Sequence, residues 1–427
     1  MAVELSRPTR GAYDVVVVGG GPAGSTAAAL VAREGHSVLL LDRERFPRFR
    51  IGESLMPATY WTLKRLGVLE QMKASPFVRK HSVQFFSKNG RSGAPFYFSE
   101  IDDHESSATW QVDRLGFDKM LLDNARKTGV EVHERANVKD VLFDGARATG
   151  VLVEFADGAR AELESRVVVD ASGQSGLLSR KLKLKNQDEK LWHASIYTRY
   201  SGARRDEGID GGATLIMHTD DGKSWFWYIP LQDDQVSVGV VGPIDYLLKD
   251  RRGGPQVIFD EQLQRCPAML ERVESAEQIM DATPVRDFSY ISKRIAGDGW
   301  VLAGDAFGFL DPIYSTGVFL ALKSGENAAD AIVEALDKQD FSAAVLGCHG
   351  DDYVAGMEAL RKLVYAYYDE QFNFARFLER YPSRREDLVN LLVGNIFRRP
   401  VDAMFEEMSE MCRLPEARCL ERSEPAE

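Results

Sequence analysis

The chain has 427 residues, of which 44% are hydrophobic and 28% are charged, and its formal net charge at pH 7 is −12. This composition is typical of a globular protein, and the length allows a large core shared by two interleaved domains. The negative charge argues against nucleic acid as a binding partner.

The sequence contains no apolar run of about 18 residues, so we expect no integral membrane segment. The start of the chain, MAVELSRPTRGAYD, lacks the apolar core of a signal peptide, which makes the cytoplasm the expected location. The four cysteines have neither metal nor redox spacing, and the seven histidines form no His-x-x-Glu-His cluster. We therefore expect no metal site.

Residues 13–44 predict a strand, a glycine turn, a helix and a second strand. Gly19, Gly21 and Gly24 form G-x-G-x-x-G, in which the glycines allow a tight turn, the approach of a pyrophosphate and close packing of the helix on the strand. Asp42 ends the second strand, where an acid can bind a ribose diol. The pattern predicts a site for FAD or NAD(P). Its predicted cofactor-binding residues are Gly19, Gly21, Pro22, Ala23, Gly24, Ser25 and Asp42.

Three later segments carry further strands. Residues 111–145 predict a strand, a helix and a strand, and RVVVDASGQSG (166–176) predicts a strand that ends in an acid and glycines. GWVLAGDAFGFLDP (299–312) predicts a buried strand with Asp305 at its tip. No second G-x-G-x-x-G follows, so the sequence shows no dedicated NAD(P)H domain, and the electrons must come from elsewhere or from a transiently bound nicotinamide.

These segments, together with the glycine fingerprint, resemble the FAD-binding fold of the glutathione reductase type found in the para-hydroxybenzoate hydroxylase class. The resemblance covers about residues 13–340 and favours FAD over NAD(P). It implies that Asp305 bonds the ribityl chain, that Arg114 lies beside the cofactor and that the Val138 backbone touches the adenine.

Residues 194–243 are rich in strand patterns and predict an antiparallel sheet that covers the cofactor and supplies a substrate wall. Within it, the alternation of WFWYIP (225–230) directs Trp225 and Trp227 to one face of a strand. Phe226 and Tyr228 are directed to the other face. Without a family resemblance, packing in the core is the simplest function for these rings.

FLDPIYSTG (309–317) is followed by a helical pattern over residues 318–337. The hydroxyl groups and Gly317 therefore stand at a helix N-terminus, where unpaired N–H groups can hold an anion or the electron-rich edge of a cofactor. Residues 350–410 are helical by spacing and rich in aromatic residues, which most simply pack helices together.

The predicted fold is α/β, a Rossmann-type FAD-binding fold with an antiparallel substrate sheet and a helical C-terminal segment. We expect a discontinuous FAD-binding domain (1–185 and 285–345), a substrate sheet (186–284) and a helical cap (346–427).

Three motifs then resemble those of flavin-dependent halogenases: G-E-S-L-x-P (52–57), W-x-W-x-I-P (225–230) and F-x-x-P-x-x-S-x-G (309–317). Members of this family use reduced FAD, O2 and chloride or bromide to form hypohalous acid, which halogenates an electron-rich aromatic ring in antibiotic biosynthesis. The resemblance implies FAD and a halide as cofactors, and a separate flavin reductase as a partner.

The resemblance also implies roles for single residues. The halide contacts the backbone N–H groups of Thr316 and Gly317, with Ser315 at the catalytic turn. Trp225, Trp227 and Tyr314 keep the substrate away from the flavin. The residues that follow the second strand or bend over the flavin, and so add to the cofactor site, are Arg50, Gly52, Glu53, Ser54, Pro312 and Gly317.

The essential lysine of the family is assigned to Lys80, because PFVRKHSVQFF (76–86) resembles the family segment G-F-x-x-K-x-G-x-x-F. Both glycines that frame the family lysine are replaced here, by Pro76 and Ser82. Lys73 and Lys88 are the alternatives.

Tyr314 stands where tryptophan halogenases carry a glutamate immediately before S-T-G. The position is not glutamate in phenol and pyrrole halogenases, some of which act on substrates tethered to carrier proteins. We therefore expect a phenol or pyrrole ring, free or carrier-bound, as the substrate.

Three alternatives remain open on sequence alone. An aromatic hydroxylase or an isoprenoid reductase could use the same fold. A flavoprotein maturase could instead oxidise a side chain of a partner protein, and a flavin protein without catalysis could sense redox state.

Overall fold

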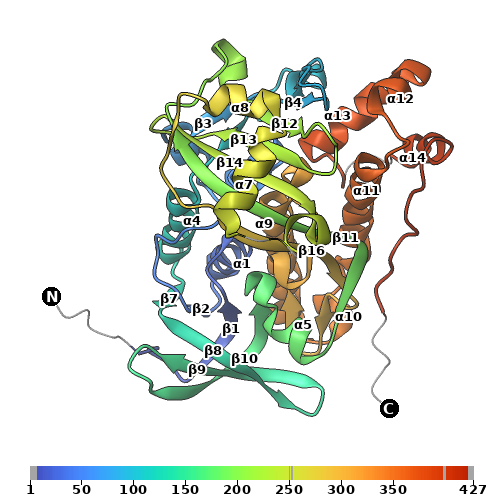
Figure 1. Ribbon diagram of the computed structural model, residues 1–427. Helices are drawn as coiled ribbons and strands as arrows, with labels where there is room; N and C mark the ends of the chain where they lie inside the picture. Colours follow the sequence, from blue (N-terminus) through green and yellow to red (C-terminus); the bar gives the residue numbers. More distant parts are fainter. Residues whose placement is uncertain (1–6, 250, 252, 398–400, 422–427) are drawn as a thin grey trace.

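The computed structural model describes residues 7–249, 251, 253–397 and 401–421, and Figure 1 shows the course of the chain. The outermost residues of the predicted FAD-binding domain and cap, 1–6 and 422–427, lie outside this range. Two large sheets organise the molecule, one in the lower half and one in the upper half of Figure 1.

The lower sheet has the strand order β17-β18-β10-β1-β2-β7, and β9 and β8 extend it beside β10. β1 pairs in parallel with β10 and with β2, as β10 does with β18. The run of valines in β1 suits a parallel strand that is buried on both faces. The strands are β1 (Ala12–Val18), β2 (Val38–Asp42), β7 (Glu131–Glu134), β8 (Ala136–Asp144), β9 (Arg147–Phe155), β10 (Arg160–Asp170), β17 (Ala296–Gly297) and β18 (Trp300–Leu302).

Two helices meet over the glycine turn that follows β1. Helix α1 (Pro22–Arg33) packs against α9 (Thr316–Lys338). A Cβ atom at Gly24 would lie 1.9 Å from the Gly19 carbonyl oxygen, and one at Gly325 would lie 2.4 Å from the Ala23 carbonyl oxygen. Only glycine allows this approach, which agrees with the packing role expected for the third glycine of the fingerprint.

The upper sheet has the order β19-β16-β11-β14-β13-β12-β4-β5, with β15 beside β11. Its neighbours pair antiparallel except β12 and β4, which are parallel. The strands are β4 (Ser82–Phe86), β5 (Phe96–Tyr97), β11 (Lys185–Ser201), β12 (Thr214–His218), β13 (Trp225–Pro230), β14 (Gln235–Pro243), β15 (Glu277–Gln278), β16 (Thr283–Ser292) and β19 (Gly308–Phe309). A small separate sheet pairs β3 (Val78–Lys80) with β6 (Thr109–Gln111).

The upper sheet separates two hydrophobic cores. Trp225 and Trp227 pack into the large core that also contains the lower sheet, whereas Phe226 and Tyr228 pack into a second core on the opposite face. The alternation expected for this strand is therefore observed. β4, β5 and β19 come from segments outside residues 186–284. The upper sheet therefore includes more of the chain than the predicted substrate sheet.

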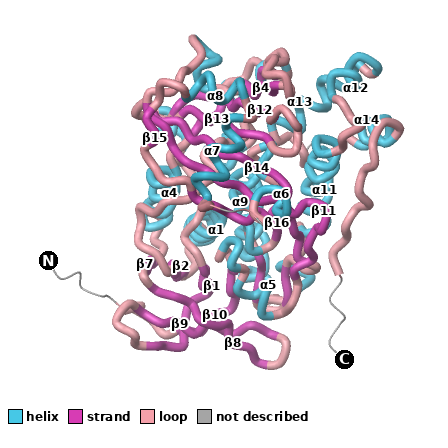
Figure 2. The backbone as a smooth tube through the Cα atoms, viewed as in Figure 1, coloured by secondary structure: helices cyan, strands magenta, loops and turns pink. Residues whose placement is uncertain are grey.

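Helices cover both sheets, and those of the C-terminal segment lie together on one side of the molecule (Figure 2). The remaining helices are α2 (Thr59–Arg65), α3 (Leu69–Lys73), α4 (Arg114–Lys127), α5 (Leu177–Lys181), α6 (Ile244–Leu247), α7 (Pro255–Gln264), α8 (Pro267–Val273), α10 (Ala343–Leu346), α11 (Gly350–Tyr368), α12 (Phe374–Arg380), α13 (Arg385–Val393) and α14 (Asp402–Ser409). Short 3-10 helices are η1 (Phe98–Glu100), η2 (Glu105–Ser107), η3 (Gly173–Ser175), η4 (Gly208–Gly212), η5 (Gly304–Ala306), η6 (Pro312–Tyr314) and η7 (Pro382–Arg384). The predicted α/β class with an antiparallel sheet and a helical C-terminal segment is confirmed.

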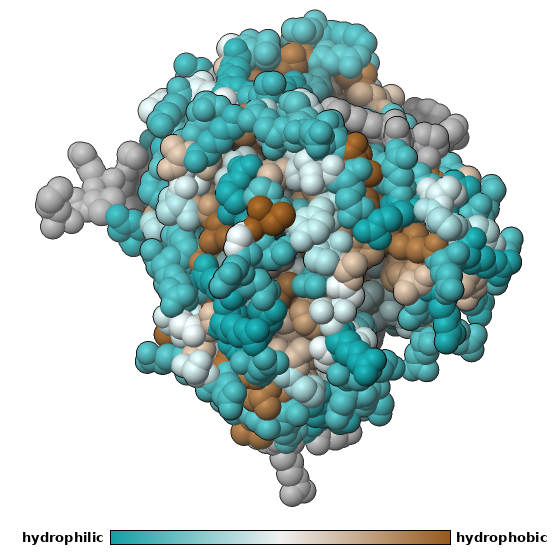
Figure 3. Space-filling view, turned by 90° about the horizontal axis from the view of Figure 1, so that it is seen from above, coloured by the Kyte–Doolittle hydropathy of each residue, from teal (hydrophilic) through white to brown (hydrophobic). Residues whose placement is uncertain are grey.

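The face of the molecule seen in Figure 3 is largely hydrophilic, with hydrophobic residues scattered over it. Among the described residues, no helix is both long and apolar enough to cross a membrane. The same part of the chain contains no cluster of three or more metal-binding side chains.

Candidate active site

A cavity of about 790 Å³ lies between the two sheets. It opens at the carboxyl ends of parallel strands, since Val18, Asp42, Ala171 and Ala303 line it. The upper sheet contributes other lining residues, among them Trp227. The volume is typical of a site for a large cofactor, and this edge of a parallel sheet is where such ligands bind.

The glycine turn forms one wall of the cavity. Gly19 has a φ of +105°, and a Cβ atom there would lie 2.3 Å from the Ala171 carbonyl oxygen, so the turn requires glycine. The Asp42 carboxylate lines the cavity and accepts a hydrogen bond of 2.7 Å from the Gly20 N–H. Asp42 therefore also holds the turn in shape.

Six of the seven residues predicted from the glycine fingerprint belong to the turn and the start of α1, and the cavity separates them into two groups. Gly19, Gly21, Pro22 and Ala23 line the cavity. Gly24 and Ser25 do not, and the Ser25 hydroxyl instead donates 2.8 Å to the Gly20 carbonyl. These two residues support the turn from behind.

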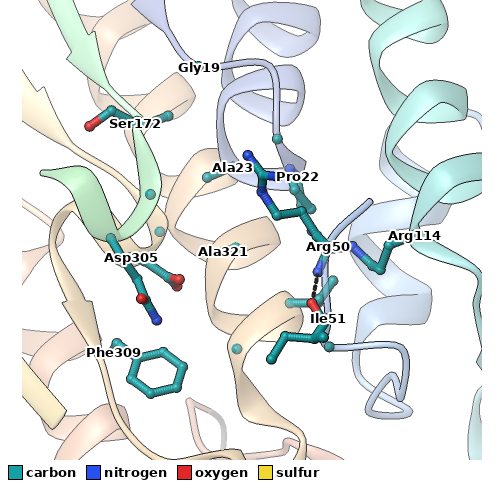
Figure 4. Close-up of a pocket in the computed structure, with 18 of the residues that line it drawn as sticks. Gly19, Pro22, Ala23, Arg50, Ile51, Arg114, Ser172, Asp305, Phe309 and Ala321 are labelled. Carbon is teal, nitrogen blue, oxygen red and sulfur yellow. Dashed lines mark hydrogen bonds between the residues drawn. The ribbon is translucent and has the colours of Figure 1, made fainter. Parts of the chain in front are cut away.

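A buried cluster of guanidinium groups lies beside the turn. Asp118 is 0% exposed and accepts hydrogen bonds of 2.8 Å from Arg48 and 2.7 Å from Arg114. Arg114 also donates 2.7 Å to the Ile51 carbonyl, as Figure 4 shows. Both arginines line the cavity and give it positive charge that suits a pyrophosphate. Arg48 was not predicted from the sequence, because it belongs to no motif.

Two acidic residues stand further along the cavity wall. Asp305, at the tip of β18, lies across the opening from Arg50 and Arg114 in Figure 4, and burial raises the pKa of its carboxyl to about 6. Burial also raises the pKa of Glu53, which accepts a bond of 3.0 Å from the Gly52 N–H. The other predicted residues that line the cavity are Arg50, Gly52, Ser54, Val138, Pro312, Ser315, Thr316 and Gly317.

The start of α9 also faces the cavity. Ser315 precedes the helix with a left-handed φ of 57°, and its side chain makes no capping hydrogen bond. Thr316 and Gly317 are the first helical residues, whose N–H groups have no acceptor within the helix. Apart from its chain neighbours and the backbone of α9 itself, no protein atom lies within 4 Å of a Cβ atom built on Gly317, so space is open beside these donors. The nearby Asp311, which we did not predict, lines the cavity and caps η6 through the Ile313 N–H at 3.0 Å.

Lys80 lies behind the cavity wall rather than in it. Its side chain is 4% exposed, and its amine donates 2.8 Å to the Ser54 hydroxyl and 3.1 Å to the Leu55 carbonyl. Burial lowers the pKa of this amine to about 7. Of the alternatives, Lys73 is 34% exposed and paired with two glutamates, and Lys88 is exposed. Lys80 donates to Ser54, which lines the cavity, whereas the two glutamates paired with Lys73 do not line it.

The residues expected to shield the flavin occupy two places. Trp227 lines the cavity and donates 3.1 Å to the Ser237 hydroxyl. Trp225 and Tyr314 do not line it, and both rings instead lie edge-on to Tyr367 of α11, at centroid distances of 6.1 and 6.2 Å. This contact could not be predicted from the sequence, because it joins three segments that are distant in the chain.

Known proteins resemble the chain along most of its length. Residues 12–343 match the family described as FAD binding domain. A 1H-pyrrole-2-carbonyl peptidyl-carrier-protein brominase of Pseudoalteromonas luteoviolacea is 33% identical, over 90% of this chain and 92% of that protein. A 1H-pyrrole-2-carbonyl peptidyl-carrier-protein chlorinase of Pseudomonas fluorescens is 30% identical, over 93% of each protein.

Two solved halogenase structures are also similar to the chain in fold and sequence. The flavin-dependent brominase Bmp2 superposes with a TM-score of 0.83 at 32% identity, covering 93% of this chain and 98% of its own. The chain belongs to the flavin-dependent halogenases. The chondrochloren halogenase CndH, at 29% identity and a TM-score of 0.78, covers 94% of this halogenase and 97% of itself.

The family membership confirms several expectations. The halogenase is an FAD-dependent oxidoreductase with the predicted FAD-binding fold, and its cofactors are FAD and a halide. The halogenase prediction is supported over a hydroxylase, an isoprenoid reductase and a maturase. The residues of the cavity fit FAD, since an open glycine turn, a basic cluster and two acidic strand ends line a single cavity of about 790 Å³.

Proposed function

We propose that this halogenase acts on an electron-rich pyrrole ring attached to a carrier protein. The observation that carries the proposal is the match, over at least 90% of this chain and of each relative, to two enzymes named for pyrrole-2-carbonyl carrier substrates. A tryptophan 2-halogenase of Chondromyces crocatus is also similar, at 34% identity, but this chain spans only 60% of it. Tyr314, in place of the glutamate of tryptophan halogenases, favours the same conclusion.

The residues that would hold FAD follow the cavity from end to end. Asp42 and the Val138 backbone would hold the adenosine part, and the glycine turn with Arg48 and Arg114 the pyrophosphate. Asp305 would hold the ribityl chain. Bound in this way and reduced, FAD supplies the activation of O2 that converts the halide to hypohalous acid.

The halide would be held by the N–H groups of Thr316 and Gly317, where the positive end of the α9 dipole favours an anion. Ser315 would set this position, because its left-handed conformation turns the chain into the helix.

The indole of Trp227 would cover the flavin side, and Trp225 and Tyr314, packed on Tyr367, would form the wall behind it.

Lys80 would deliver the halogen. With a pKa of about 7, a large fraction of the amine is neutral at physiological pH. The neutral amine can attack the halogen of hypohalous acid: an N–X bond forms, the O–X bond breaks, and the hydroxide that leaves takes the amine proton to give water. The halogen is then held in one position for transfer to the ring.

The test is a bromination assay with FAD, a flavin reductase, bromide and a peptidyl-carrier protein loaded with pyrrole-2-carbonyl. We expect mass spectrometry to detect bromine on the carrier-bound ring, and little on free pyrrole-2-carboxylate or phenol. A separate reductase is expected because no second glycine fingerprint for NAD(P)H occurs in the chain. The cytoplasmic location inferred from the sequence stays a prediction.

Variants separate formation of the oxidant from its use. Lys80→Met is expected to form hypobromous acid, measured by loss of a halogenation-sensitive dye, but to lose carrier bromination. Lys73→Met is the matched control and should brominate normally, since its ammonium is paired with Glu70 and Glu105. Bromination of the free ring in preference to the carrier would refute the carrier substrate, and addition of one oxygen atom would indicate a hydroxylase.

A further inference from the structure

A buried chain of hydrogen bonds connects Lys80 with the wall of the cavity. The Lys80 amine donates 2.8 Å to the Ser54 hydroxyl, which lies 2.9 Å from the Thr214 hydroxyl. Thr214 in turn accepts a bond of 2.8 Å from the Gln111 amide nitrogen. All four side chains are at most 4% exposed, and they come from four separate segments of the chain. Ser54 and Thr214 line the cavity, whereas Lys80 and Gln111 do not.

Gln111 determines which groups donate and which accept in this chain of hydrogen bonds. Its amide nitrogen also lies 3.0 Å from the Gly212 carbonyl oxygen, which can only accept. The atom facing Gly212 must therefore be the NH2 group, and that group also donates to Thr214. Because the Thr214 oxygen accepts from Gln111, its own proton is available to Ser54 at 2.9 Å.

Ser54 lies between Lys80 and Thr214 in this chain of hydrogen bonds. Its oxygen accepts from Thr214 on one side and from the Lys80 amine on the other, so both of its lone pairs are used. Its own proton then has no acceptor within the chain of bonds and is free to point into the cavity, which Ser54 lines. The backbone supports this arrangement, because Ser54 forms a β-bridge with Gln111.

We propose that Gln111 and Thr214 are positioning residues for Lys80, which act by ordering the hydroxyl of Ser54 so that it accepts from the amine and donates into the cavity. The proposal rests on the proposed function of Lys80 as the group that receives the halogen. With Ser54 and the Leu55 carbonyl both accepting, a neutral amine uses its two N–H groups and keeps its lone pair free. If Ser54 instead donated to the amine, the lone pair would be occupied.

The surroundings of Lys80 suit this arrangement. Its ammonium would also lie 5.3 Å from the centroid of the Phe98 ring. Glu53 is bonded to the Gly52 N–H, and Arg79 lies 4.3 Å over the Trp110 ring. The titratable side chains next in sequence to Lys80 or to its partner Ser54 are Glu53, Arg79 and His81. Burial, rather than any of these charges, is the cause of its low pKa.

The first test measures the titration of Lys80 itself and needs no catalysis. Protein labelled with 13C at the lysine Cε position is titrated by NMR, with and without FAD, and the Lys80 signal is assigned by its loss in Lys80→Met. Thr214→Val frees Ser54 to donate to the amine, which stabilises the neutral form, so the midpoint should fall by about 0.5 to 1 pH. Ser54→Ala removes an acceptor from the ammonium and should also lower the midpoint.

Two controls accompany these variants. Thr214→Ser keeps the hydroxyl and should restore the midpoint of the wild type. Thr198→Val makes the same change at another buried threonine of the upper sheet. The Thr198 hydroxyl donates to the Met280 carbonyl and takes no part in the hydrogen bonds around Lys80. This substitution should leave the midpoint unchanged.

The second test compares two rates. In Thr214→Val, the rate of bromination of the carrier-bound ring, divided by the rate of hypobromous acid formation, should be about tenfold lower than in the wild type. In a Lys80→Met background this substitution should have no further effect, because it acts through Lys80. A purely structural role would instead weaken FAD binding and lower both rates together.

The outcomes distinguish the two proposals. Unchanged Lys80 midpoints in Thr214→Val and Ser54→Ala would overturn the ordering proposed here, whatever the enzyme catalyses. Lowered midpoints in a protein whose wild type forms no hypobromous acid would support the ordering and refute the proposed function. Equal loss of both rates in Thr214→Val, or failure of Thr214→Ser to restore them, would also overturn the ordering.

Discussion

A lysine that is buried and loses its charge near neutral pH affects stability as well as chemistry. Lys80 is 4% exposed, and burial lowers its pKa from 10.5 to about 7. Between these two values the unfolded chain binds more protons than the folded chain, so this residue makes the free energy of unfolding rise with pH. Below about pH 7 its full burial cost is present. The residue proposed to deliver the halogen therefore destabilises the fold.

The corresponding prediction concerns Lys80→Met. The substitution removes the cost of burying an ammonium, so we expect it to raise the free energy of unfolding most at about pH 6, and less as the pH rises toward 10. The advantage over the wild type should shrink by roughly 2 to 4 kcal/mol across this range. Urea unfolding at several pH values measures it. Lys73→Met, at an exposed lysine, should show no such trend, and parallel pH profiles for Lys80→Met and wild type would contradict the prediction.

At the scale of elements, helices α1 and α9 both begin at the cavity, but their glycines have different surroundings. A Cβ atom on Gly24 would lie 1.9 Å from the Gly19 carbonyl oxygen, which is backbone and cannot give way. Gly317 has open space around it and lines the cavity. One glycine is therefore required by packing, and the other leaves room for a ligand.

This contrast predicts opposite results for two alanine substitutions. Gly24→Ala should displace α1 from β1, lower the melting temperature by several degrees and abolish FAD binding. Gly317→Ala should melt at or above the temperature of the wild type, because alanine is the better helix former, but should raise the bromide concentration needed for half-maximal rate. Gly254→Ala, with equal space at the start of α7, is the matched control. Equal halide requirements in Gly317→Ala and wild type would argue against a halide beside this residue.

How far the sequence could predict these elements depends on the range of the contacts. The glycine turn and the alternation of Trp225 and Trp227 are local patterns, and both were predicted correctly because each is set by residues a few positions apart. The bond from Lys80 to Ser54 joins residues 26 positions apart, and that from Trp225 to Tyr368 spans 143. No local pattern encodes such pairs, so these contacts, like the ion pair of Arg48, were visible only in the structure.

At the scale of the whole molecule, the helical C-terminal segment is joined to the upper sheet by a buried group of charges. Arg361 of α11 is 3% exposed and donates to Glu358 and, at 2.9 Å, to Asp188 of β11. Asp188 also accepts 2.6 Å from Tyr365 and lies 3.1 Å from Arg418. One carboxylate therefore connects the sheet, α11 and the last described part of the chain, and α11 is the helix whose Tyr367 packs on Trp225 and Tyr314.

Removal of Asp188 should therefore loosen the C-terminal segment as a unit. Asp188→Ala leaves the two arginines, Arg361 and Arg418, with a single carboxylate partner, Glu358. An uncompensated buried charge costs about 3 to 5 kcal/mol. We expect a loss of that order in the free energy of unfolding and faster amide hydrogen exchange along α11, while β1 and α1 keep their protection. Glu334→Ala, which breaks the exposed pair with Lys338, is the control and should change neither. If Asp188→Ala exchanged faster in the lower sheet as well, α11 would not be a separate unit, and its contacts would contribute to the stability of the whole fold.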